Sequence, residues 1–197
     1  MARQPGPPAP RLAAVSAVLP ATPEHVWALV ADVRNHARWV PFTRIDVPDD
    51  GAPAKATGTG TGTSPGAAFP LGATFTAVSG PGARRGLPGL PDRMLVTFFS
   101  PPAAGTPGEA VYRKLGPVLL GTAGVRVDPV ATPPGPEPGT GDATTGASPG
   151  TPSSSRLTWT EDVHLRGLPR ALTAPLLRPV LAVMLRVVLA RLRRELG

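Results

Sequence analysis

Short apolar runs of strand type recur along this chain, separated by stretches that have no hydrophobic periodicity. Within most runs apolar residues alternate with polar ones, which is typical of a β-strand with one buried face. Because the runs follow one another with few helical segments between them, they predict an α+β fold built on an antiparallel sheet of about six to seven strands. The predicted strands are residues 12–19, 43–47, 73–78, 93–99, 111–115, 123–130 and 156–165.

Two short helices are predicted directly after the first strand. Thr22 is a favourable N-cap, and Pro23 fits the first helical position, where its missing N–H group costs nothing. The apolar residues that follow recur at three- and four-residue spacing, as on the buried face of a helix. Asp32 can cap a second short helix over 33–39, which Pro41 ends.

A long helix is predicted from Pro169 to near the end of the sequence. Pro175 and Pro179 fall in its first turns and should kink the helix or delay its regular start. Arg178 and Arg186 interrupt its most apolar stretch, so no run reaches the roughly 18 uncharged residues of a membrane-spanning helix. The expected buried face consists of Leu177, Val180, Leu181, Met184, Val188 and Leu192.

Three segments lack the apolar residues needed to offset the entropy of ordering. Residues 1–10 are rich in proline and predict a disordered tail, whereas 49–72 and 131–155 predict low-complexity loops of Gly, Pro, Ser, Thr and Ala. The remainder, from 11 to 197, is expected to form a single domain, because a chain of 197 residues is long enough for one hydrophobic core.

The net charge of +7 is concentrated at the C-terminal end, where residues 166–197 hold seven arginines and one glutamate. Arginine makes up 18 of the 20 basic residues, as in proteins from GC-rich genomes such as those of actinobacteria. No aromatic and basic residues are interleaved, so we expect no nucleic-acid partner. A basic apolar helix instead suits weak contact with an anionic membrane surface.

The chain contains no cysteine and three histidines, which excludes disulfides and thiol nucleophiles and disfavours a histidine-rich metal site. We therefore expect neither a metal nor a cofactor. The apolar run 12–19, preceded by Arg3 and Arg11, weakly imitates a signal peptide. A capped helix follows this run at once, so a first strand and a cytoplasmic protein are the favoured interpretation.

The order of these elements and several of their residues resemble the START-like superfamily, also called SRPBCC. Its members include polyketide cyclases, aromatases and lipid carriers. The resemblance implies a helix-grip fold, in which a curved sheet surrounds a long C-terminal helix and leaves a cavity between them. It rests on Ala21-Thr22-Pro23-Glu24-x-Val26-Trp27, on Asp32 and Trp39-x-Pro41, and on Leu157-x-Trp159 with the closing helix.

The resemblance implies binding of a hydrophobic small molecule, such as a lipid, a polyketide or an aromatic metabolite, in the internal cavity. One alternative is a polyketide cyclase or dehydratase that uses acid–base groups in that cavity. Another is a peripheral membrane protein that exchanges lipids. The superfamily has no universal catalytic motif, so whether the chain is an enzyme stays open at this point.

Glu161 is the main candidate for acid–base chemistry. Strand alternation places it with Trp159 and Val163 on the apolar face of 156–165, where burial would raise its pKa. The alternative is a solvated carboxylate at the cavity rim. Arg113 is the second candidate, because it shares a face with Val111 and Leu115 and would be the inward cation if that face were buried. The alternative is an exposed arginine that faces a neighbouring strand.

Other candidates are assigned by position rather than by chemistry. Asp162 and His164 lie on the polar face of their strand and are expected to form a surface pair; His25 and His36 are also expected to be exposed. The residues expected to contact a ligand are Trp39, Phe75, Met94, Phe98, Trp159 and Met184.

Overall fold

The computed structural model describes residues 13–48, 71–130 and 154–197, and everything below refers to these residues. The predicted tail 1–10 and most of the two low-complexity tracts lie outside them. The strands are β1 (Ala13–Leu19), β2 (Thr43–Asp46), β3 (Thr74–Ser79), β4 (Leu90–Ser100), β5 (Gly108–Pro117), β6 (Leu119–Val130) and β7 (Ser154–Leu165). The helices are α1 (Pro23–Val30), α2 (His36–Trp39) and α3 (Arg170–Leu196), with 3₁₀ turns η1 (Val33–Asn35) and η3 (Ala83–Arg85).

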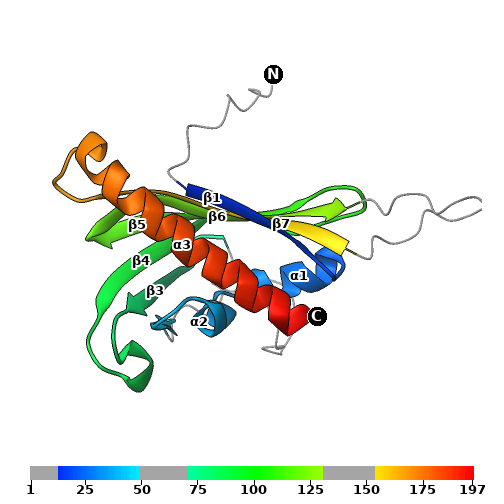
Figure 1. The fold of residues 1–197 in the computed structure, drawn as a ribbon, viewed down its shortest axis with the longest axis horizontal. Helices are drawn as coiled ribbons and strands as arrows, with labels where there is room; N and C mark the ends of the chain where they lie inside the picture. The colour runs from blue at the N-terminus through cyan, green and yellow to red at the C-terminus, as the bar shows by residue number, and fades with distance from the viewer. Residues whose placement is uncertain (1–12, 49–70, 131–153) are drawn as a thin grey trace, which may run out of the picture.

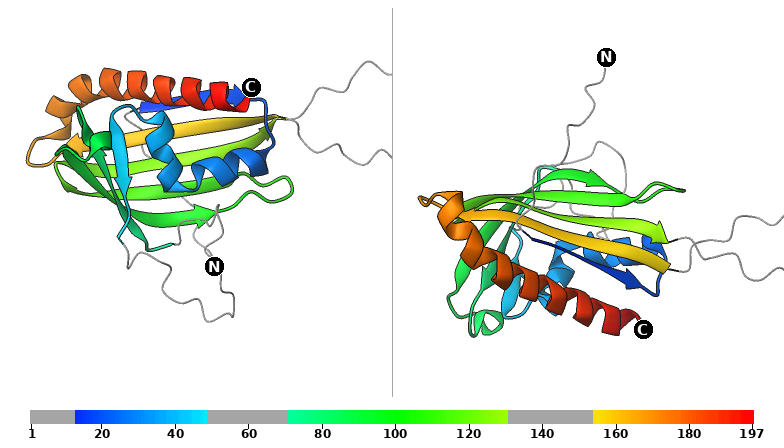
Figure 2. Two further views of the ribbon diagram at one scale, coloured as in Figure 1. Left: turned by 90° about the horizontal axis from the view of Figure 1, so that it is seen from below. Right: turned by 45° about the horizontal axis from the view of Figure 1, so that its top comes forward.

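The seven strands form one antiparallel sheet in the order β1-β7-β6-β5-β4-β3-β2. Figures 1 and 2 show this sheet curving, with α1, α2 and α3 together on one side of it. The long helix α3 contacts β1, β7 and α2, whereas α1 contacts β6 and β7. The predicted α+β helix-grip arrangement is confirmed.

Local capping explains why the two short helices begin where the sequence predicts. The Thr22 hydroxyl accepts the backbone N–H of His25 at 3.3 Å, and Pro23 occupies the first turn. The Asp32 carboxylate accepts the N–H of Arg34 at 3.0 Å and opens η1, which leads directly into α2. The predicted segment 33–39 is therefore a 3₁₀ turn followed by one α-helical turn.

The helix α3 runs from Arg170 to Leu196 with both prolines inside it, and only part of its predicted face is buried. Val188 and Leu192 are fully buried, whereas Val180 is 61% exposed, so its predicted burial is wrong. Leu185 and Leu189, which were not predicted, are buried. The buried side chains of α3 therefore gather mainly in its second half. Among the described residues, α3 alone is long and apolar enough, by length and composition, to cross a membrane.

Candidate functional site

A cavity of about 380 Å³ lies between the inner face of the sheet and α3. Every strand except β1 contributes to its wall, together with α2, α3 and the segment between α2 and β2. The volume falls within the roughly 300–1,000 Å³ that is usual for small-molecule pockets in proteins. Its wall is predominantly apolar and includes Ile45, Phe75, Met94, Trp159, Leu181 and Met184.

Two apolar residues of the wall also reach the surface. Leu90, the first residue of β4, is 44% exposed, and Val180 of α3 is 61% exposed. The wall therefore meets solvent at the start of β4 and in the first half of α3.

Small residues in the sheet leave room for the cavity. The register places Tyr112 of β5, Ala123 of β6 and Glu161 of β7 side by side in one row across the sheet. Ala123 is buried and lines the cavity between the two larger side chains. A larger residue at this position would fill space that is now empty.

A buried charged cluster lies in the cavity wall and joins three strands. The Lys114 ammonium of β5 is 2.5 Å from Asp92 Oδ2 of β4 and 3.4 Å from Glu161 Oε2 of β7. The Lys114 side chain is 5% exposed and that of Glu161 is 8% exposed. One cation is thus shared by two carboxylates in a low-dielectric environment, where such interactions are strong.

Burial and charge shift the proton affinities of this cluster. Burial raises the pKa of Glu161 because desolvation of the carboxylate outweighs the attraction of Lys114, and Asp92 adds to the rise. Burial alone would lower the pKa of Lys114, but Glu161 and Asp92 together raise it. The cluster therefore holds a firmly protonated lysine beside a carboxyl group that takes up a proton more readily than a solvated glutamate.

The buried Tyr112 hydroxyl of the cavity wall has no hydrogen-bond partner among the residues that the structure describes. Burial raises the pKa of Tyr112, so its hydroxyl keeps its proton. Because an unsatisfied buried polar group costs about 1–3 kcal/mol, this donor would gain from an acceptor supplied by water or by a guest. The buried Trp159 indole N–H makes no hydrogen bond of full geometry but interacts with the Glu161 carboxyl group, which lowers the pKa of Glu161 against the larger effect of burial.

His36 also belongs to the cavity wall, and its predicted exposure is wrong. It is 5% exposed, and its Nε2 lies 2.8 Å from the Val30 carbonyl oxygen, to which it donates when protonated there. Its ring contacts those of Trp159 and Tyr112, with centroids 5.0 Å and 6.2 Å away. Burial lowers the pKa of His36 despite the hydrogen bond to Val30, so the neutral ring is favoured. Its burial depends on side chains far away in the sequence.

Most predicted contact residues are brought together by the fold. Phe75, Met94, Trp159 and Met184 line the cavity, and Glu161 is buried in its wall as strand alternation indicated. Their roles in ligand binding or catalysis stay predictions.

Arg113 lies on the opposite side of the sheet and is exposed, so the alternative of an exposed arginine holds and its tentative place among the inward catalytic groups is wrong. The strand β5 is longer than predicted, and its buried face consists of Gly108, Ala110, Tyr112, Lys114 and Gly116. Val111 and Leu115, which lie on the same face of β5 as Arg113, are apolar, so from the sequence this outer face resembled a buried one. Lys114 is the inward cation, and the alternation of Ala110 and Tyr112 was the signal that could have identified it.

Phe98 and Trp39 are also displaced from the predicted site. A register shift between Val96 and Phe98 leaves Phe98 47% exposed and brings Phe99 against Trp27, with ring centroids 5.2 Å apart. Trp39 is buried but does not line the cavity; its indole N–H donates to Glu195 Oε2 at 2.7 Å and ties α2 to the end of α3.

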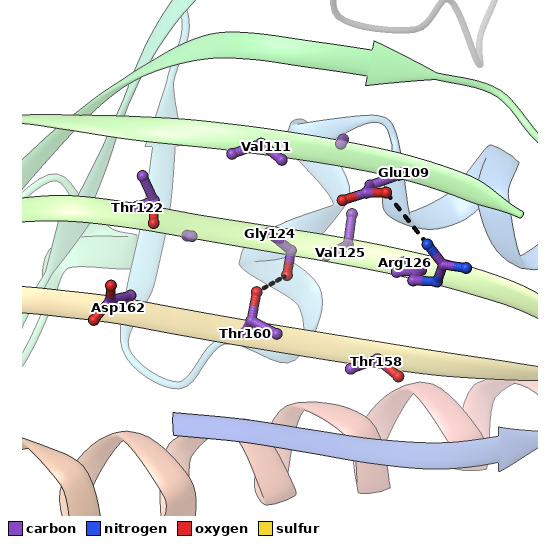
Figure 3. Close-up of a pocket in the computed structure, with 11 residues that line it drawn as sticks. Glu109, Val111, Thr122, Gly124, Val125, Arg126, Thr158, Thr160 and Asp162 are labelled. Atoms are coloured by element: carbon purple, nitrogen blue, oxygen red, sulfur yellow. Dashed lines mark hydrogen bonds and ion pairs between the residues drawn. The ribbon is translucent and has the colours of Figure 1, made fainter. Parts of the chain in front are cut away.

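A second hollow, of about 170 Å³, lies over β5, β6 and β7 on the outer face of the sheet (Figure 3). Gly124 contributes no side chain there, and its carbonyl accepts the Thr160 hydroxyl at 3.3 Å. Asp162 lines this hollow and pairs with Arg170, whereas His164 is half-buried and outside it. No group of three potential metal-ligating side chains occurs among the described residues. The hollow is smaller and more polar than the inner cavity, which is the better candidate site.

Comparison with known proteins identifies the fold. Neither a protein-family model nor a curated protein matches the sequence. A START superfamily protein from Mycobacterium smegmatis is similar in structure, with a TM-score of 0.53, 12% identity, and coverage of 93% of this chain and 95% of that one. A conserved protein from Geobacillus kaustophilus gives a TM-score of 0.50 at 15% identity, covering 92% and 91%. The protein therefore has the START-like helix-grip fold.

Proposed function

We propose that the protein binds a neutral hydrophobic small molecule in the cavity between the sheet and α3. The START-like fold is generally a ligand-binding fold. The observation that carries the proposal is the apolar cavity of about 380 Å³, whose wall meets solvent at Leu90 and Val180. Since each buried methylene group contributes about 0.8 kcal/mol, a guest of ten or so carbon atoms would gain substantial free energy from this wall.

The charges of the wall support a neutral guest over an anionic one. Lys114 is already matched by Asp92 at 2.5 Å and by Glu161 at 3.4 Å. A fatty-acid carboxylate would therefore meet two carboxyl groups and no unmatched cation in this cluster. The Tyr112 hydroxyl instead suits an oxygen acceptor such as a ketone, an ester or a quinone. Within the classes expected from the sequence, this favours a polyketide, an aromatic metabolite or a neutral lipid.

The proposed setting is the cytoplasm. The apolar run that imitates a signal peptide contributes strand β1, which pairs with β7 along its full length. That segment is therefore used by the fold itself.

Native mass spectrometry of the purified protein is the first test, since a tightly held guest would remain bound. Prodan, a neutral fluorescent ketone, and anilinonaphthalene sulfonate, an anionic dye of similar size, then serve as paired probes. We expect saturable prodan binding with blue-shifted emission and much weaker binding of the sulfonate. Equal or stronger binding of the sulfonate would contradict the neutral-guest proposal.

A second candidate function, proton-transfer catalysis on a polyketide, is favoured by the pair of Glu161 and Lys114 in the cavity wall. Glu161 has a raised pKa, so it holds a proton at higher pH than a solvated glutamate does, which suits a group that gives and takes a proton during catalysis. With a turned-over substrate in hand, Glu161→Gln should keep binding and lose roughly 10²-fold or more in turnover. Glu109→Gln, on the outer face, is the matched control. Unchanged turnover in Glu161→Gln would leave binding as the function.

A further inference from the structure

The first half of α3 leaves a stripe of large apolar side chains uncovered. Leu172, Leu176, Val180 and Val183 are 69%, 66%, 61% and 58% exposed. Their spacing of four, four and three residues places them on one side of the helix. We call these four residues the outer stripe. It extends over about 16 Å of helix, at 1.5 Å per residue.

The exposure extends along most of the apolar part of the helix. Only 22% of the most apolar 18-residue stretch of α3 is buried in the fold. Leu168, just before the helix, is 51% exposed as well. Single exposed apolar residues are ordinary, but a contiguous uncovered patch of large ones marks a surface that contacts something apolar.

The charges around the outer stripe indicate which partner covers it. Arg186 and Arg194 are exposed and form no ion pair with any residue that the structure describes. They follow Val183 by three and eleven residues, which places them on the same side of the helix as the outer stripe. The helix carries six arginines and one acidic residue, Glu195, at its far end, where Arg38 pairs with it. An apolar stripe flanked by arginines complements an anionic lipid surface, in which the apolar side chains enter the acyl boundary and the arginines meet the headgroups.

We propose that the outer stripe of α3 docks the protein onto anionic membrane surfaces, with α3 lying in the interface rather than spanning the bilayer. A spanning helix would have to leave the sheet and expose Leu185, Val188 and Leu192, which are fully buried. A second copy of the chain is disfavoured as the partner, because two such surfaces would bring their arginines together. Val180 belongs to both the outer stripe and the cavity wall, so docking brings this part of the cavity wall to the membrane.

Co-sedimentation of the full chain with phosphatidylcholine vesicles, with or without 30% phosphatidylserine, tests this proposal without any guest. Wild type should bind the anionic vesicles, bind neutral ones far more weakly, and dissociate as salt is raised. The triple variant Leu172→Ser, Leu176→Ser, Val183→Ser should bind roughly tenfold or more weakly, since its apolar contacts are lost. It spares Val180 and hence the cavity wall.

Two control variants separate docking from general effects of substitution. Phe98→Ser removes an exposed apolar side chain from β4 and should leave vesicle binding unchanged. Arg186→Glu with Arg194→Glu should abolish the preference for anionic vesicles, whereas Arg113→Glu with Arg156→Glu, on other exposed positions, should reduce it much less. Circular dichroism shows that each variant is folded.

These outcomes test membrane docking separately from the binding of a guest in the cavity. Absence of wild-type binding to anionic vesicles, or equal binding by the triple variant, would overturn the proposal. A wild-type dimer in solution that the triple variant converts to a monomer would overturn it too, since the outer stripe would then be an interface between copies. Vesicle binding without any prodan binding would support docking while contradicting the proposed cavity function.

Discussion

The two halves of α3 have similar apolar content, but the apolar side chains of one half are mostly buried and several large ones of the other are exposed. In the second half, Leu185, Val188, Leu189 and Leu192 are buried against the rest of the fold. In the first half, the residues of the outer stripe are more than half exposed. The second half is thus anchored, and the first half extends beyond β1 and the short helices α1 and α2 as Figure 1 shows, while contributing Leu177, Val180 and Leu181 to the cavity wall. Hydrophobic composition alone does not distinguish a core-forming segment from a surface available for binding.

Truncating one leucine in each half should show the difference between the halves most clearly, as a difference in the free energy of unfolding. Leu192→Ala, in the second half, should reduce the free energy of unfolding by about 3 kcal/mol, because a fully buried side chain leaves a cavity. Leu176→Ala, in the first half, should change it by less than about 0.5 kcal/mol. Urea denaturation of both variants measures the difference. Equal losses would show that the first half is also packed, against the exposure described above.

Removing the hydrogen bond that anchors the end of α3 should have a smaller effect. Glu195→Ala deprives the buried Trp39 indole N–H of its acceptor and should cost about 1.5 kcal/mol, as expected for a hydrogen bond to a charged group. Arg193→Ala, two residues earlier and exposed, is the control and should be nearly neutral. If both substitutions had the same effect in thermal denaturation, the bond would not anchor the helix.

Acidification should lower the stability of the folded protein through His36 of α2, the helix that the second half of α3 contacts. The pKa of His36 is lowered in the folded state, so the unfolded chain takes up a proton first as pH falls below about 6.5. Stability from this residue is therefore complete above about pH 6.5 and declines below it, by at most about 1.4 kcal/mol per pH unit. Glu161, whose pKa is raised, acts in the opposite sense: its contribution is present below its unfolded pKa and is lost as pH rises through its folded pKa.

Comparison with His36→Gln isolates the histidine, because Glu161 is present in both proteins. The thermal midpoint of wild type should fall more between pH 7.5 and pH 5.5 than that of the variant. Identical pH dependence in the two proteins would mean that His36 titrates in the folded state as it does in water.

The sequence predicted what depends on local pattern. Thr22 and Asp32 cap helices through side-chain bonds to the next few residues, and each strand follows from a short run of alternating residues. Strand alternation likewise placed Glu161 on the inner face correctly. These features need no knowledge of distant partners.

The errors arise where distant contacts or an irregular strand decide the outcome. Alternation does not say which face of β5 is inner, so Arg113 was chosen in place of Lys114. The register shift before Phe98 reverses the remaining residues of β4 and leaves no local signature. The cluster of Asp92, Lys114 and Glu161 joins three strands, so only the assembled sheet reveals it.

The most direct test of an internal binding cavity is to fill it with a larger side chain on the sheet. Ala123→Leu adds three carbon atoms to the wall between Tyr112 and Glu161, whereas Thr122→Leu adds an apolar side chain at the neighbouring, exposed position on the other face. Fluorescence titration with prodan should give saturable binding to wild type and Thr122→Leu, and at least roughly tenfold weaker binding to folded Ala123→Leu. Equal prodan binding by all three proteins, or none by wild type, would contradict an internal binding cavity.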